Sequence, residues 1–240
     1  MKNIRIGQKE IIHFIGIGGI GMSGLAQVMK NMGFNIQGSD QFKNKNTAAC
    51  IKAGIKVFNG HSKKNIKGTN LVVISSAIDK KNPELIQAKN ESITIIPRAE
   101  MLGSIMIGYE SIAVAGSHGK TSTTSMIAKI ISMANLSPTY VVGGKVLSSD
   151  KNSHLGDGKY IVVEADESDG TFTHLQPDVA VLTNINDDHL VHYDNSFEKL
   201  LDSFVMFAEN VPFYGYMAVS YTHLRAHETR GNLVCRLLLE

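Results

Sequence analysis

The chain is poor in the features that mark secreted, membrane-spanning or nucleic-acid-binding proteins. Its 240 residues include two cysteines, Cys50 and Cys235, which lie far apart without the spacing of metal ligands and so fit a reducing compartment. No apolar run approaches the ~20 residues of a membrane span, and residues 1–10 lack the apolar core of a signal peptide. A net charge of +2 provides no broad basic field. We expect a cytoplasmic protein that binds neither nucleic acid nor membrane; its oligomeric state stays open.

Apolar segments and helical patterns alternate along the chain. With 43% hydrophobic residues and 22 glycines, the composition is that of a globular α/β protein. Strands are predicted at 71–74, 112–115, 160–164 and 179–182, each largely a continuous apolar run suited to a buried parallel strand. This rhythm predicts a doubly wound parallel sheet over residues 1–108 and a second α/β unit over residues 109–218.

A glycine-bracketed loop joins the strand at 112–115 to a predicted helix. The loop consists of Gly116, Ser117, His118, Gly119, Lys120, Thr121 and Ser122. Backbone N–H groups of such a loop converge on phosphate oxygens, while Lys120 supplies a charge for the terminal phosphates and Thr121 a hydroxyl for Mg²⁺. The common pattern would place a glycine at position 114, which is Val114, so this loop is shorter than usual. It indicates a particular branch of nucleotide-using enzymes.

Polar side chains follow the next two predicted strands. Glu164 extends one strand and opens the sequence EADESDG, while Asp188 and His189 follow the other strand. The carboxyl ends of parallel strands meet at one edge of a sheet, and carboxylate oxygens are preferred Mg²⁺ ligands. His189 is a candidate metal ligand or phosphate contact. The alternatives are a solvated acidic turn and an ordinary surface histidine.

A second glycine pattern lies near the N-terminus. Gly16, Gly18 and Gly21 fit G-x-G-x-x-G between a strand and a helix, and Asp40 follows Gly21 by 19 residues. This arrangement is typical of dinucleotide-binding domains, in which the diphosphate lies at the helix N-terminus and the acid contacts a ribose. It does not separate NAD from other diphosphate-linked nucleotides, and a plain glycine turn is the alternative. An NAD-dependent oxidoreductase is therefore one candidate function.

The last 22 residues differ in composition from the rest of the chain. Residues 1–218 contain 19 lysines and two arginines, whereas residues 219–240 contain three arginines and no lysine. We expect residues 219–240 to be a non-native tail; a basic C-terminal helix is the alternative.

Several stretches, in order, resemble the Mur ligases. They are HFIGIGGIGMSGLA at 13–26, GSD at 38–40, SSAI at 75–78, PRAEML at 97–102, GSHGKTSTT at 116–124, EADESDG at 164–170 and LQPDVAVLTNI at 175–185. The resemblance implies an α/β protein with a Rossmann-like N-terminal domain, followed by an incomplete P-loop α/β central domain. Members of the family are considerably longer, so it also implies a truncated, inactive fragment.

The resemblance further implies an activity and the residues that serve it. The activity is ATP- and Mg²⁺-dependent ligation of L-alanine to UDP-N-acetylmuramate through an acyl phosphate, in peptidoglycan precursor synthesis. Lys120, Glu164 and His189 would be catalytic, and Thr121, Glu164 and His189 would hold Mg²⁺ or touch the γ-phosphate. The UDP-sugar would contact Gly18, Gly19, Gly21, Ser39, Asp40, Ser75, Ser76 and Arg98. A non-catalytic UDP-sugar-binding module is the third candidate function.

Overall fold

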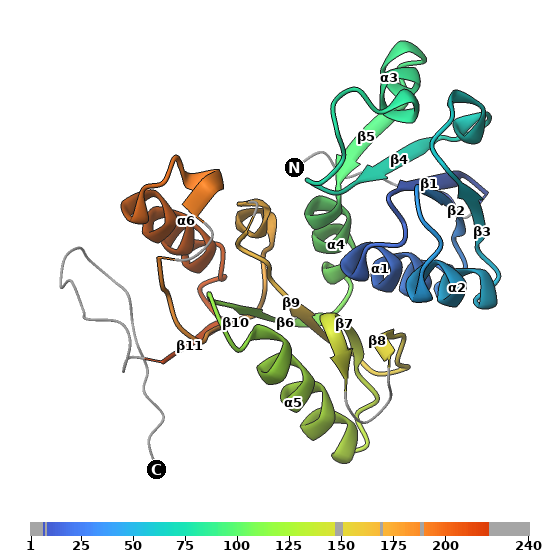
Figure 1. Cartoon of the computed structure of the whole chain (residues 1–240). Coiled ribbons are helices and arrows are strands. Elements are labelled where there is room, and N and C mark those ends of the chain that lie inside the picture. Colours follow the sequence, from blue (N-terminus) through green and yellow to red (C-terminus); the bar gives the residue numbers. More distant parts are fainter. Residues whose placement is uncertain (1–6, 8, 147–150, 169, 188–189, 221–240) are drawn as a thin grey trace. The chain divides into compact units, whose positions relative to one another are not determined.

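The computed structural model describes residues 7, 9–146, 151–168, 170–187 and 190–220 (Figure 1). The strands are β1 (Ile11–Ile15), β2 (Asn35–Asp40), β3 (Lys56–Asn59), β4 (Leu71–Ile74), β5 (Thr94–Pro97), β6 (Glu110–Ala115), β7 (Thr139–Val146), β8 (Lys151–His154), β9 (Tyr160–Glu164), β10 (Val179–Leu182) and β11 (Tyr216–Val219). The helices are α1 (Ile20–Asn31), α2 (Lys45–Lys52), α3 (Pro83–Asn90), α4 (Arg98–Met106), α5 (Lys120–Met133) and α6 (Phe197–Glu209), with short 3-10 helices η1 (Lys63–Ile66), η2 (Thr171–His174) and η3 (Leu190–Tyr193).

The described residues cluster into two compact units. The first is drawn from residues 1–104 and 140–156, and the second from residues 105–139 and 157–240. None of the helices in the described part of the chain has the length and apolarity needed to cross a bilayer.

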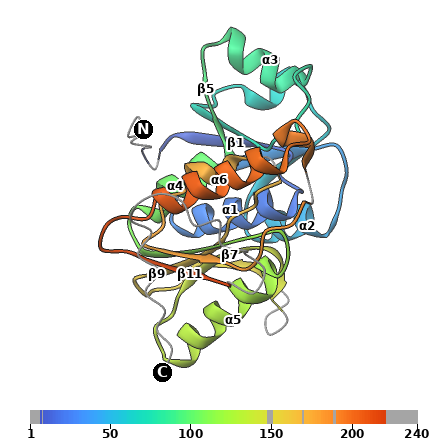
Figure 2. The same ribbon diagram turned by 90° about the vertical axis from the view of Figure 1, so that its left-hand side faces the viewer.

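The first sheet has five strands in the order β3-β2-β1-β4-β5, and every neighbouring pair is parallel. Helices α1 and α2 lie on one face and α3 on the other (Figures 1 and 2). Because both faces are covered, the central strands β1 and β4 are largely apolar: Phe14, Val72 and Val73 are fully buried. The strand order reverses between β1 and β4, so the crevice for a ligand is expected at the carboxyl end of β1.

The second sheet is mixed, with the order β11-β10-β6-β9-β7-β8. Strands β11, β10, β6 and β9 run parallel, whereas β7 and β8 pair antiparallel. Helices α5 and α6 lie on opposite sides of the parallel strands (Figures 1 and 2). The carboxyl ends of β6, β9 and β10 therefore meet at one edge of this sheet.

Helix α6 is held by an aromatic cluster. Its residues Leu200, Phe204 and Phe207 recur at helical spacing and are buried. The ring of Phe172, in η2, lies 5.0 Å from that of Phe204 and 5.3 Å from that of Phe207, centroid to centroid. Aromatic rings at these separations add stabilisation beyond the area they bury. This cluster fixes the segment that follows β9.

The α/β class and the parallel N-terminal sheet predicted from the sequence are confirmed, with several local differences. Strand β2 includes Gly38, Ser39 and Asp40, because these residues pair with β3. Pro97 is the last residue of β5, and an edge strand tolerates proline there. Elements α2, β3, α4, β8 and β11 were not predicted. Helix α2 did carry a signal, since Asn44 and Thr47 form a capping box at its start.

Candidate functional site

The loop between β6 and α5 is closed by two glycines in left-handed conformations. Gly119, at the N-cap of α5, has φ +80°. Gly116 has φ +131°, and a Cβ built on it would lie 2.2 Å from Thr183 Oγ1 and 2.7 Å from the Asn184 carbonyl oxygen. A side chain at 116 is therefore excluded both by the backbone conformation and by the loop after β10.

The segment after β10 braces this loop. Ser117 N donates to the Asn184 carbonyl at 3.0 Å, and His118 N donates to Asn184 Oδ1 at 2.9 Å. Thr183 Oγ1 in turn donates to the His118 carbonyl at 2.6 Å, and Asn186 N donates to Ser117 Oγ at 2.9 Å. The residues of the sequence TNIN thus shape the phosphate loop, a supporting role that sequence reasoning missed. Their place after a strand that neighbours β6 was the available signal.

Lys120 begins α5 and its side chain turns back over the loop. Its Nζ donates to the Gly116 carbonyl at 2.7 Å and to the Ser117 carbonyl at 3.3 Å, and lies 2.7 Å from Glu167 Oε2. Burial raises the pKa of Glu167, and the ion pair with Lys120 opposes that rise. The sequence placed Glu167 in an acidic run without showing that it faces the lysine.

Thr121 and Glu164 meet at the same edge of the sheet. Thr121 Oγ1 lies 3.1 Å from Glu164 Oε1 and 3.0 Å from Oε2, because β9 pairs in parallel with β6 and ends beside the loop. Hydroxyl and carboxylate oxygens are the donors that Mg²⁺ prefers. Among the described residues no three His, Cys, Asp or Glu side chains form a metal-binding group. The third predicted ligand, His189, lies outside the described residues, as does Asp188. His118, Gly119 and Ser122 are exposed on the loop.

In the first unit, the end of β2 supports the glycine loop after β1. The Ser39 carbonyl accepts from Gly16 N at 2.8 Å and from Ile17 N at 3.0 Å. The carboxylate oxygen Asp40 Oδ2 accepts from Gly18 N at 2.8 Å. A Cβ on Gly18 would lie 2.7 Å from that same oxygen, so glycine is required for this close approach. The backbone N–H of Gly18 therefore donates to the Asp40 carboxylate in this structure.

The guanidinium of Arg98 lies beside the start of α1. A Cβ on Gly21, the second residue of α1, would be 3.0 Å from Arg98 Nη1. The guanidinium therefore lies against the first turn of α1. Gly19, the N-cap of α1, is exposed and has no side-chain cap. The helix N-terminus and Arg98 together favour an anion here. Ser75 is half-buried and Ser76 exposed, just past the end of β4.

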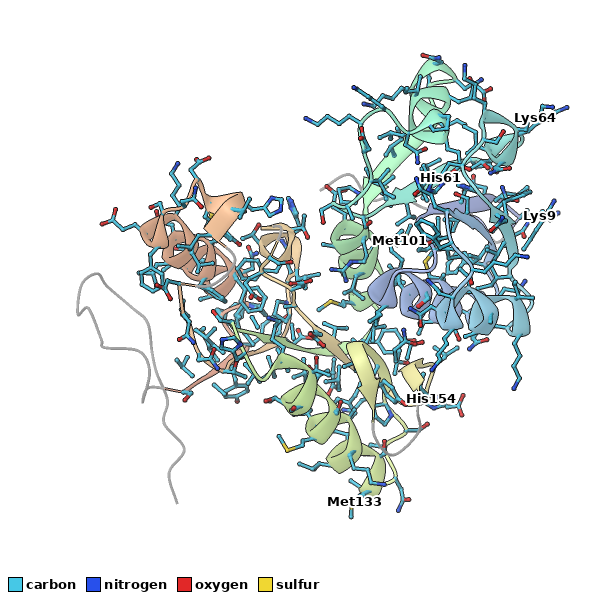
Figure 3. The ribbon with its side chains drawn as sticks, in the orientation of Figure 1. Lys9, His61, Lys64, Met101, Met133 and His154 are labelled. Atoms are coloured by element: carbon cyan, nitrogen blue, oxygen red, sulfur yellow. The ribbon has the colours of Figure 1, made fainter. Side chains whose placement is uncertain are left out.

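The Ser39 side chain belongs to a buried network beneath this loop. Its Oγ donates to Glu84 Oε2, whose side chain is 0% exposed and also contacts His13 Nε2 at 3.3 Å and His61 Nδ1 at 3.2 Å. Figure 3 labels His61. Asn65 and the Ser62 amide donate to Oε1. Burial alone would raise the pKa of Glu84, but the hydrogen bonds, led by that of His13, lower it to about 2. The hydroxyl of Ser39 thus ties the end of β2 to Glu84.

Two family profiles match the chain. The profile described as "Mur ligase family, catalytic domain" matches residues 11–110, and that described as "Mur ligase middle domain" matches residues 114–233. A Neisseria gonorrhoeae protein named UDP-N-acetylmuramate–L-alanine ligase is 48% identical over 217 residues, covering 90% of this chain and 46% of that protein. A Xylella fastidiosa protein of the same name is 50% identical over 204 residues, covering 85% and 43%.

A solved structure is also similar. The UDP-N-acetylmuramate–alanine ligase of Thermotoga maritima matches with a TM-score of 0.81 at 33% identity, covering 88% of this chain and 49% of that one. The chain spans about half the length of the relatives that it matches.

Proposed function

This chain belongs to the Mur ligase family, and from that premise we propose that it serves the ATP-dependent ligation of L-alanine to UDP-N-acetylmuramate. The observation that carries the proposal is the convergence of Lys120, Thr121 and Glu164 on one loop. Relatives named for this activity are 48% and 50% identical to the chain. The reaction belongs to peptidoglycan precursor synthesis, and we place it in the cytoplasm.

We assign the ATP-binding domain to residues 109–218. The phosphates of ATP would then bind in the second unit. The amides of Ser117 and His118 already donate to Asn184, so we assign the phosphates to the backbone amides of the first turn of α5. Lys120 neutralises charge on the terminal phosphates. Thr121 and Glu164 fit Mg²⁺ because their oxygens already lie within hydrogen-bonding distance; a bound Mg²⁺ supplies further neutralisation of the phosphates. We assign His189 to the same set.

We assign the UDP part of the sugar nucleotide to the first unit, over residues 1–108. The glycine loop allows the diphosphate to approach the N-terminus of α1, and Arg98 adds a positive charge there. Asp40 ends β2, and Ser75 and Ser76 follow the end of β4; we assign all three to the same ligand. Ser39 holds the loop in shape through its carbonyl and, through its hydroxyl, ties it to Glu84.

The chemistry explains why ATP is needed. An oxygen of the substrate carboxylate attacks the γ-phosphorus, ADP leaves, and an acyl phosphate results. The amine nitrogen of L-alanine then attacks the acyl carbon, and inorganic phosphate and a proton are released as the amide forms. A free carboxylate is a poor electrophile with a poor leaving group, so activation precedes amide formation. The residues of the loop contribute by stabilising charge on the transferring phosphoryl group.

Calorimetry with three ligands tests the proposal. We expect the chain to bind UDP-N-acetylmuramate and ATP with Mg²⁺, and Lys120→Ala to weaken ATP binding without affecting the UDP-sugar. Lys129→Ala removes an exposed lysine from the same helix and serves as the matched control. Binding of NAD without UDP-N-acetylmuramate would instead support an oxidoreductase. Binding of the UDP-sugar without ATP would leave a non-catalytic module. Phosphate release from ATP, compared with and without L-alanine, reports turnover.

A further inference from the structure

The carboxylate of Glu167 is buried beside the phosphate loop and has no part in the function proposed above. Its Oε2 lies 2.7 Å from Lys120 Nζ, and its side chain is 1% exposed against 13% for that of Lys120. The ammonium also donates hydrogen bonds to the carbonyl oxygens of Gly116 and Ser117. It is therefore held by two carbonyl oxygens of the loop and by the ion pair with Glu167.

Glu167 is fixed in place by its backbone. Its carbonyl accepts from Gly170 N at 2.9 Å and from the Tyr193 hydroxyl. Neither of its carboxylate oxygens accepts a hydrogen bond within the described part of the chain. A buried carboxylate with so few partners depends on its counter-ion, because an uncompensated buried charge is strongly unfavourable. Lys120 is that counter-ion. Separating the two side chains would leave a buried charge without compensation and so cost free energy.

We propose that Glu167 is a positioning residue that acts through Lys120: it holds the ammonium over the loop and stays its counter-ion when a triphosphate binds. The inference rests on the proposed function, since it requires a nucleotide phosphate at the loop. The ion pair fixes the direction of the lysine but lowers the net positive charge that ATP meets. Glu167→Gln therefore tightens ATP binding, whereas loss of a purely structural contact would weaken it.

The first measurement is the acetylation rate of Lys120 in the whole chain without nucleotide, using N-hydroxysuccinimide acetate and mass spectrometry of the modified peptide. We expect Glu167→Gln to raise this rate about ten-fold or more, because the amine loses its ion pair and is no longer held over the loop. Asp166→Asn is the matched control: it removes the same charge from the adjacent residue, whose carboxylate accepts from Ser168 N. Its effect should stay below about two-fold. Equal rates in wild type and Glu167→Gln overturn the inference.

The second measurement is the affinity for ATP with Mg²⁺ by calorimetry. We expect Glu167→Gln to lower the Kd about three-fold or more; an unchanged or higher Kd overturns the inference. If wild type binds no ATP while Glu167 still protects Lys120 from acetylation, the proposed function fails and the pairing is upheld. Circular dichroism verifies folding. Should Glu167→Gln not fold, Glu167→Asp, which keeps the charge but shortens its reach, replaces it: faster acetylation supports the inference and an unchanged rate overturns it.

Discussion

The hydroxyl of Thr121 lies 3.1 and 3.0 Å from the two carboxylate oxygens of Glu164, although the residues are 43 positions apart. The contact joins the first turn of α5 to the last residue of β9. It exists because β9 pairs in parallel with β6, so that both strands end at the same edge of the sheet. A hydroxyl and a carboxylate thus stand together where the loop would present phosphates.

Glu164→Gln should weaken the dependence of ATP binding on magnesium. An amide oxygen is a poorer Mg²⁺ ligand than a carboxylate, so we expect the Mg²⁺ concentration for half-maximal ATP binding to rise about ten-fold. Fluorescent-nucleotide titrations across a Mg²⁺ series measure this. Glu110→Gln is the control, because Glu110 is an exposed acid at the opposite end of β6, paired with Lys159. Identical Mg²⁺ curves for wild type and Glu164→Gln would refute the assignment.

Gly116→Ala should destabilise the second unit strongly. The new Cβ would meet Thr183 Oγ1 at 2.2 Å on a backbone with φ +131°, and we expect a loss of about 3 kcal/mol in the free energy of unfolding. Gly119→Ala has a similar backbone problem, with φ +80°, but open space around it, so its loss should be about 1 kcal/mol. Urea denaturation measures both. Equal losses of stability in the two variants would show that the clash with Thr183 does not contribute to the destabilisation.

Lys120→Met should cost stability that Glu167→Gln recovers. The single variant leaves a buried carboxylate without its counter-ion, for an expected loss of about 3 kcal/mol. In the double variant that charge is gone, so we expect it to be more stable than Lys120→Met alone. A double-mutant cycle by urea denaturation gives the coupling energy between the two side chains. Strict additivity would contradict a stabilising ion pair.

The stability of the first unit should fall in acid because of Glu84. Its pKa in the folded chain is about 2, against an ordinary value of 4.5. A lowered folded pKa contributes stability above the unfolded pKa, and that contribution, about 3 kcal/mol, is lost as the pH falls from 4.5 towards 2. We expect Glu84→Gln to be less stable near neutral pH and to show a flatter pH dependence. Glu91→Gln, an exposed acid after the same helix, should follow wild type, and a steep acid loss in Glu84→Gln would exclude this carboxylate as the cause.

Arg98→Ala should weaken binding of UDP-N-acetylmuramate. The guanidinium lies against the first turn of α1, where we place the diphosphate, so we expect the Kd to rise about ten-fold. Arg98→Lys, which keeps the charge, should recover part of the loss. Lys89→Ala, at an exposed site on α3, is the control. Calorimetry with unchanged affinity in Arg98→Ala would remove Arg98 from the site.

The sequence predicts an element well when residues within that element cause it to form, and poorly when pairing with distant residues does. The strand at 71–74 is visible because a buried parallel strand is a continuous apolar run, and it has the predicted bounds. Strand β11 is short, and its exposed positions alternate with half-buried ones; its partner, β10, is far away in the chain. Strand β2 ends in Gly38, Ser39 and Asp40, residues that indicate a turn, yet pairing with β1 and β3 keeps them extended.

The sequence by itself determined the family, the α/β class and the two glycine loops, because each is set by residue types at short spacing. A glycine followed by a lysine and a threonine carries its phosphate chemistry in its own residues. Only the tertiary structure decided which acid faces which partner. Glu164 and Glu167 lie three positions apart in one acidic run, yet one contacts Thr121 and the other Lys120. That division depends on strand register and on the path of the chain after β9, which no local pattern encodes.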